Sequence, residues 1–76
     1  MNAKRREKID VVIGLLGQAE GLLGEIQDEE QTAYENLPDS LFASERGSIM
    51  YEAIDNLESA VSSIREAVEF LKEAKG

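Results

Sequence analysis

The residues whose types and spacing favour chemistry gather around two tyrosines near the middle of the chain. They are Tyr34, Asn36, Ser44, Arg46 and Tyr51. Aromatic rings stack on nucleotide bases, and an arginine guanidinium binds phosphate through paired hydrogen bonds. Arg46 is also the only Lys or Arg between Ile9 and Ile64. We therefore predict that these five residues form a ligand-binding edge.

The same residues also have a purely structural interpretation. Asn36, Asp39 and Ser44 are residue types that cap backbone groups at helix ends and turns. The tyrosines then only cover one end of the fold, and the lone arginine forms an ion pair with Glu45, Glu52 or an acidic residue at the end of the first helix. The sequence leaves both interpretations open.

A basic cluster near the N-terminus is a second candidate. Lys4, Arg5, Arg6 and Lys8 fall in the first turns of the first predicted helix. The helix dipole makes positive charge unfavourable there. The cluster is either a solvated chain end or a site for phosphate or an acidic partner, and we include Lys4 and Arg5 among the candidate ligand-binding residues.

Catalytic and metal chemistry find little support in the sequence. The chain has no cysteine and no histidine, which removes Cys/His zinc sites, disulfides and Ser-His or Cys-His catalysis. The carboxylates of Glu25, Asp28, Glu29 and Glu30 lack the histidine that two-metal carboxylate bundles use. No glycine-rich phosphate loop is present. We predict a protein that is not an enzyme, holds no metal and uses no cofactor.

The charge balance and the hydropathy pattern limit the partners. Sixteen acidic and eight basic residues give a net charge of −8, which argues against binding DNA or RNA. The longest apolar runs have three residues, far short of the roughly 20 needed to cross a membrane. No apolar stretch follows the basic start, as a signal peptide requires. We therefore predict a cytoplasmic protein without a membrane partner.

Apolar residues recur at three- and four-residue steps in both halves of the chain, the spacing of one helical face. The first half predicts a helix over about 3–34 from Ile9, Val12, Ile13, Leu16, Ala19, Leu23 and Ile26. The second half predicts a helix over about 45–74 from Met50, Ala53, Ile54, Leu57, Ala60, Val61, Ile64, Ala67, Val68, Leu71 and Ala74. Strand patterns are absent, so the sequence predicts an all-α fold.

The only proline marks the connection between the helices, which we predict over about 35–44. It lacks a backbone N–H and disfavours helical geometry at the residue before it. Ser44 is the expected N-cap of the second helix, and Asp39 or Ser40 can begin a short turn ahead of it. We predict one domain over all 76 residues, an antiparallel two-helix hairpin.

The apolar surface exceeds what one hairpin can bury. Val11, Leu15 and Leu22 widen the apolar face of the first helix, and Ile49 and Phe70 lie beside that of the second. A chain of this size buries only about 60% of the surface that its unfolded form exposes. We predict a homo-oligomer, most simply a four-helix bundle of two hairpins. The alternative is a monomer with scattered exposed hydrophobics.

Small residues form a stripe on each predicted helix. Every seventh position of the second helix is alanine, which favours close antiparallel packing, at Ala53, Ala60, Ala67 and Ala74. The first helix has a line of glycines at Gly14, Gly17, Gly21 and Gly24. Each costs about 0.8–1 kcal/mol relative to alanine in a helix interior. We interpret the line as a close approach by another helix, subunit or ligand, with drift on an exposed face as the alternative.

Three segments carry a resemblance to known sequences: Tyr34-Glu35-Asn36-Leu37-Pro38-Asp39-Ser40-Leu41, Ser44-Glu45-Arg46-Gly47 and Ala53-Ile54-Asp55-Asn56-Leu57-Glu58-Ser59-Ala60. Over roughly residues 28 to 70 the chain resembles a group of small hypothetical proteins of phages and prophages. These carry a Tyr-Asp/Glu-Asn-x-Pro-Glu/Asp-x-Leu turn, then Ser-Glu-Arg/Gly, between two acidic helices. The chain departs from them in having Glu35 for the more usual aspartate, and Phe42-Ala43 inside the turn.

The resemblance implies a mobile-element setting, in which small oligomeric helical proteins often counter host defence. The arrangement from Leu37 to Arg46 is also similar to viral sponges that sequester cyclic-nucleotide immune signals. The leading hypothesis is an oligomeric anti-defence protein that captures a cyclic dinucleotide or a cyclic ADP-ribose. Tyr34 and Tyr51 then stack on bases, while Arg46 and the Lys4 to Lys8 cluster of a neighbouring chain meet phosphate.

Two other functions stay open at this point. An acidic protein–protein inhibitor that blocks a basic surface of a host defence protein fits the net charge. Its affinity should fall with added salt, whereas capture in an enclosed pocket should persist. A structural or regulatory bundle without any ligand is the third interpretation.

Overall fold

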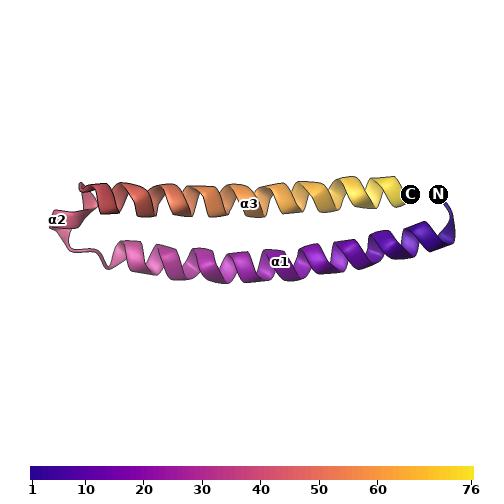
Figure 1. Ribbon diagram of the computed structural model, residues 1–76, viewed down its shortest axis with the longest axis horizontal. Helices are drawn as coiled ribbons and strands as arrows, with labels where there is room; N and C mark the ends of the chain where they lie inside the picture. Colours follow the sequence, from indigo (N-terminus) through magenta and orange to yellow (C-terminus); the bar gives the residue numbers. More distant parts are fainter.

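The computed structural model describes all 76 residues and consists of helices without strands (Figure 1). The helices are α1 (Ala3–Glu35), α2 (Asp39–Phe42) and α3 (Glu45–Lys75). The prediction of an all-α chain is therefore confirmed. Each long helix begins at the predicted residue and extends one residue beyond the predicted end. The short α2 lies where the sequence allowed a turn before Ser44.

The two long helices lie side by side and run in opposite directions, with α2 at one end and both termini at the other (Figure 1). The molecule measures 59 × 15 × 12 Å. Contacts across the pair share one register, because the two residue numbers add up to 85 in each of Asp10–Lys75, Glu20–Arg65 and Tyr34–Tyr51. This register decides which side chains meet between the helices.

Side chains cap the N-terminus of each long helix. The Asn2 side chain accepts a hydrogen bond from the backbone N–H of Arg5 at 2.8 Å. Ser44 is the N-cap of α3, as the sequence predicts, and its hydroxyl accepts from the Gly47 N–H at 3.5 Å. The same hydroxyl donates to the Leu41 carbonyl at 2.5 Å. Ser44 therefore ties α2 to α3.

Most of the less exposed residues follow alternating steps of three and four along both helices, the pattern of an antiparallel coiled coil. On α1 they are Ile9, Ile13, Leu16, Glu20, Leu23, Gln27, Glu30 and Tyr34. On α3 they are Gly47, Met50, Ile54, Leu57, Val61, Ile64, Val68, Leu71 and Lys75. Only Gly47 and Val61 are buried. The helix pair thus has almost no core of its own, since three polar residues of α1 lie on the contact stripe.

A broad apolar surface lies beside this stripe, in part exposed (Val12, Ile26, Ala33 and Ala74) and in part half-buried (Ala19, Ala53, Ala60 and Ala67). Val12, Ala19, Ile26 and Ala33 follow each other at seven-residue intervals on α1, as do the four alanines from Ala53 to Ala74 on α3. Each set directly precedes the contact stripe in sequence, so in an antiparallel pair both lie on the same side. We call this side the apolar face and include the flanking Leu15, Leu22, Ile49 and Phe70, which are each 57–62% exposed.

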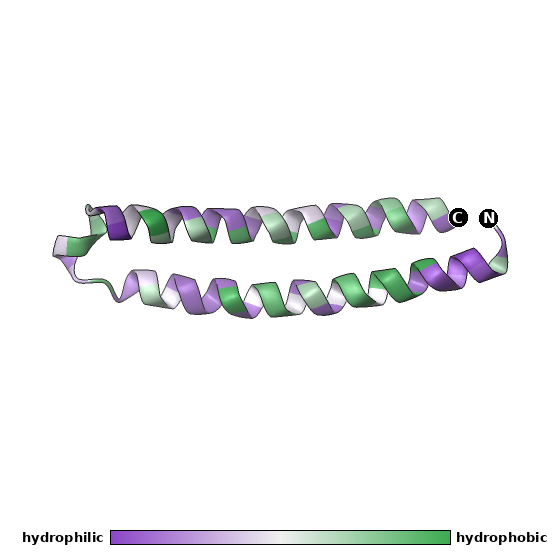
Figure 2. Ribbon diagram, in the orientation of Figure 1, coloured by the Kyte–Doolittle hydropathy of each residue, from purple (hydrophilic) through white to green (hydrophobic).

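The opposite side of the helix pair is polar, and we call it the ion-pair face. Glu20 pairs with Arg65 at 2.5 Å, and Asp10 pairs with Lys75 at 2.5 Å. Hydrophilic residues also dominate the first turns of α1 and the start of α3 (Figure 2). The two long sides of the molecule therefore differ in chemistry, one apolar and one charged.

The glycines fall into two groups with opposite surroundings. A Cβ at Gly47 would lie 2.7 Å from the Leu41 carbonyl oxygen and nearer still to that of Phe42. Gly47 is therefore required where α2 packs on α3. No atom of the chain lies within 4 Å of a Cβ built at Gly14, Gly17, Gly21 or Gly24. The close approach predicted for the glycine line is thus not made by α3.

Neither long helix has an apolar stretch of the length and composition that crossing a membrane requires.

Candidate functional site

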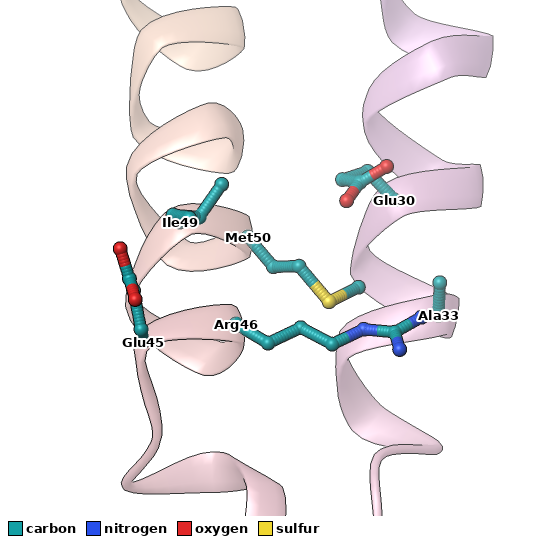
Figure 3. Close-up of a pocket in the computed structure, with 6 residues that line it drawn as sticks. All are labelled: Glu30, Ala33, Glu45, Arg46, Ile49 and Met50. Carbon is teal, nitrogen blue, oxygen red and sulfur yellow. The ribbon is translucent and has the colours of Figure 1, made fainter.

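A pocket opens between the last turns of α1 and the first turns of α3, and it is drawn in Figure 3. Its volume is about 740 Å³, and its lining residues are Glu30, Ala33, Glu45, Arg46, Ile49 and Met50. Ala33 and Ile49 belong to the apolar face, and Arg46 precedes Ala53 by seven residues. The pocket is therefore the turn end of the apolar face, and we call it the turn-end pocket.

Arg46 is the one cation of this pocket. Its side chain extends from α3 toward α1 and reaches the level of Ala33 (Figure 3). It forms no ion pair within the chain, whereas Arg65, Lys72 and Lys75 each have a carboxylate partner. The guanidinium keeps its hydrogen-bond donors for another acceptor, since an arginine fork prefers carboxylate or phosphate oxygens.

The remaining walls of the pocket are apolar or acidic. Met50 reaches across the gap toward α1, and Ile49 and Ala33 add further apolar surface (Figure 3). Glu30 and Glu45 contribute two carboxylates against the single guanidinium. Within one chain the pocket lining therefore has a net charge of −1, which disfavours an anionic ligand.

An aromatic cluster holds α2 against the long helices. The rings of Tyr34 and Phe42 meet edge to face, with centroids 5.2 Å apart and an interplanar angle of 90°. The rings of Tyr34 and Tyr51 lie 6.0 Å apart at 54°. Such pairs contribute roughly 0.5–1.5 kcal/mol beyond their buried area. Tyr34 is thus engaged on two sides, and Phe42 is a partner that the sequence did not single out.

Arg46 and the tyrosines face different sides of the helix pair. Arg46 and Tyr51 are five residues apart on α3, which is about 140° around a helix at about 100° per residue. Tyr34 and Tyr51 repeat the Glu20–Arg65 contact two heptads along the chain, so they belong to the ion-pair face. A compact ligand in the turn-end pocket of one chain therefore meets Arg46 without stacking between the two tyrosines.

The other predicted site residues have assigned places. Asn36 is the C-cap residue of α1, and its backbone N–H donates to the Thr32 carbonyl at 3.1 Å. The Ser44 hydroxyl is used in capping α3. Lys4 and Arg5 lie in the first turn of α1, at the opposite end of the 59 Å molecule from Arg46. One chain thus places the predicted turn-end residues at one end of the molecule but on different sides of it, with only Arg46 lining the pocket, and it places the basic cluster at the other end.

Glu30, Ala33 and Met50 line the pocket although the sequence had not selected them as site residues. Met50 lies four residues from Arg46 on the same helix, whereas Glu30 and Ala33 lie 16 and 13 residues away on α1 and only the helix register brings them to it. These pocket residues could have been predicted from the sequence by combining the seven-residue repeat of both helices with the length of the turn. That combination places Ala33 opposite Ala53 and next to Arg46.

No group of three or more acidic side chains converges in the way that metal ligands do. Comparisons with known proteins return no match for this chain, neither a family model nor a curated protein nor a solved structure.

Proposed function

We propose that this protein is a non-enzymatic, homo-oligomeric helical hairpin that captures an anionic nucleotide signal at its turn end. The ligand class is that of cyclic dinucleotides and cyclic ADP-ribose isomers, as in the viral sponges to which the arrangement from Leu37 to Arg46 is similar. The observation that carries the proposal is Arg46, a guanidinium without an ion-pair partner in an apolar-floored pocket.

The pocket chemistry supports a ligand that is part apolar and part anionic. Ligand sites are mostly lined by apolar groups, with a few placed polar groups that fix orientation. Met50, Ile49 and Ala33 supply an apolar floor for a base, and Arg46 supplies paired donors for a phosphate. Stacking on Tyr34 or Tyr51 is not part of this arrangement, because those rings belong to the other side of the helix pair.

Calorimetric titration of a panel of these nucleotides tests the proposal. We expect the wild type to bind at least one member and Arg46→Ala to bind it about 30-fold more weakly, because a charge-assisted hydrogen bond contributes about 2 kcal/mol. Arg65→Ala is the matched control, since it removes the same side chain from the ion-pair face. Wild-type protein that binds no member of the panel would overturn the proposal.

The acidic surface favours a second candidate function. Residues 23–62, which form the turn half of the molecule, contain ten acidic residues and one basic residue. This half can occupy a basic surface of a host defence protein in the way that nucleic acid does. Affinity for a basic protein should then fall steeply as salt rises from about 0.05 to 0.5 M, because salt screens exposed charges. Retention of a nucleotide that is insensitive to salt argues for the first function.

A further inference from the structure

The isolated chain exposes more surface than its mass requires. A folded monomer of 8.4 kDa has an accessible surface of about 4,600 Å² by the scaling of globular proteins. This chain exposes 5654 Å², an excess of roughly 1,000 Å². A standard protein interface buries about 800 Å² per partner. The extra exposed surface is therefore about as large as the area that a single protein partner buries in a standard interface.

We propose that a second copy of this chain covers the apolar face, with its turn at the opposite end of the dimer. The two-fold axis passes by Leu22 and Ser63, the mid-points of the face on α1 and α3. A two-fold interface uses the same patch on both subunits. The assembly is an antiparallel four-helix bundle in which α1 packs on α1 of the second copy and α3 on α3.

The sequence of the face is matched to this axis. Val12 and Ala33 lie ten and eleven residues from Leu22 in opposite directions, and Ala19 and Ile26 lie three and four residues from it. Val12 and Ile26 of α1 therefore each meet an alanine of the second copy, which is how facing helices interdigitate, while Leu22 meets its own counterpart at the axis. On α3 the axis pairs alanine with alanine and allows the close contact that the seven-residue repeat indicates.

Charge decides between the two possible orientations. The turn half, residues 23–62, has a net charge of −9, and the remaining residues have a net charge of +1. A two-fold axis along the molecule would place the two −9 halves side by side. The axis proposed here places the turn half of each copy, with its net charge of −9, against the remaining residues of the other copy, with their net charge of +1. Like-charge contact disfavours the first arrangement, and complementary charge favours the second.

The same axis brings the basic cluster of the second copy to the turn-end pocket. Arg5 and Arg46 each lie 17 residues from the axis, measured from Leu22 and Ser63, while Lys8 and Ile49 each lie 14 residues from it. Arg5 and Lys8 also precede Val12 and Leu15 by seven residues, so they continue the apolar face.

The second copy changes the net charge of the pocket lining from negative to positive. Two carboxylates and one guanidinium give the lining a net charge of −1 within one chain. Arg5 and Lys8 of the second copy raise it to +1. Each pocket thus becomes attractive to a phosphate-bearing ligand only in the dimer, and the dimer holds two such pockets. The ligand part of this inference rests on the proposed function, whereas the interface does not.

Single-cysteine cross-linking tests the interface, because the chain has no cysteine of its own. Disulfides form only where Cα atoms come within about 7 Å. We expect Leu22→Cys to oxidise to a covalent dimer by itself. We expect Val12→Cys and Ala33→Cys to cross-link when mixed, but neither to cross-link alone. Gly21→Cys, one residue from Leu22 but off the face, is the control that stays monomeric on a denaturing gel.

Four results would overturn the interface, the first three being a monomeric native mass, failure of Leu22→Cys to cross-link, and cross-linking of Ala33→Cys with itself. Cross-linking of Gly21→Cys in preference to Leu22→Cys would place the partner on the glycine line and also overturn it. Circular dichroism of each variant establishes that it is helical before oxidation.

Titration with cyclic dinucleotides and cyclic ADP-ribose isomers tests the completed pocket separately. The double variant Arg5→Ala/Lys8→Ala should weaken binding at least about tenfold while the mass stays dimeric, because it removes two charges from the pocket. Lys72→Ala, which removes a cation of α3 that pairs with Glu69 outside the basic cluster, is the control with unchanged affinity. Equal losses in both variants overturn the pocket assignment. A cross-linked dimer that binds no nucleotide overturns the proposed function and leaves the interface intact.

Discussion

Replacing Gly47 by alanine should destabilise the protein, although alanine is the better helix former. The added Cβ would lie 2.7 Å from the Leu41 carbonyl oxygen and closer to that of Phe42. Both are backbone atoms, so the clash is relieved only by moving α2 away from α3. That movement also strains the Ser44 cap and the contact between Phe42 and Tyr34. We estimate a cost of about 2 kcal/mol from the typical penalty of overpacking.

The assay is thermal unfolding followed by circular dichroism at one fixed protein concentration, because oligomers melt at concentration-dependent temperatures. A loss of about 2 kcal/mol lowers Tm by roughly 8–16 °C in a chain of this size. Gly17→Ala is the matched control. Its Cβ meets no atom within 4 Å, so it should gain up to about 1 kcal/mol from helix propensity and raise Tm.

The two substitutions should therefore shift Tm in opposite directions, down for Gly47→Ala and up for Gly17→Ala. A Gly47→Ala protein that melts above the wild type would show that α2 does not pack against α3 as described. A Gly17→Ala protein that loses stability or assembles differently would show that a partner approaches the glycine line, as the sequence first indicated.

Further substitutions test the cap, the apolar face and the ion-pair face. Ser44→Ala should cost about 1 kcal/mol through the lost N-cap, whereas Ser48→Ala should change stability by less than about 0.5 kcal/mol; equal melting of the two would refute the capping role. Ala60→Leu should cost roughly 1–3 kcal/mol by overpacking the seam and should shift the native mass toward monomer, and an unchanged Tm would place Ala60 in solvent. Glu20→Gln should cost no more than about 1 kcal/mol at low salt, because Arg65 is largely exposed, and a larger effect that persists at high salt contradicts this.

The helices could be predicted from the sequence because their signals are local. The three-four spacing of the apolar residues, Pro38 and the Ser44 cap each act within one or two helical turns, and the structure has all three. The angle between Arg46 and Tyr51 around α3 could also be predicted from the sequence, since it depends only on the number of residues between them. The predicted ligand-binding edge combined Arg46 and Tyr51 because they are close in sequence, although their side chains point about 140° apart around the helix.

The turn-end pocket needed non-local information. Ala33 and Met50 meet only in the register that the pairs Glu20–Arg65 and Asp10–Lys75 define. The polar residues on the α1 contact stripe were hidden for the same reason, because periodicity ranks apolar positions and ignores a glutamate between them. The excess of apolar surface was readable from composition, but its position on one side of the helix pair was not.

In the proposed assembly, two copies of the chain together hold a nucleotide. Native mass spectrometry of the protein, purified from a cell that produces defence signals, tests it most directly because subunit number and bound small molecules are read together. We expect a species of twice 8.4 kDa that carries up to two nucleotide ligands and loses them in the Arg46→Ala variant. A folded species of 8.4 kDa with no bound ligand would contradict it.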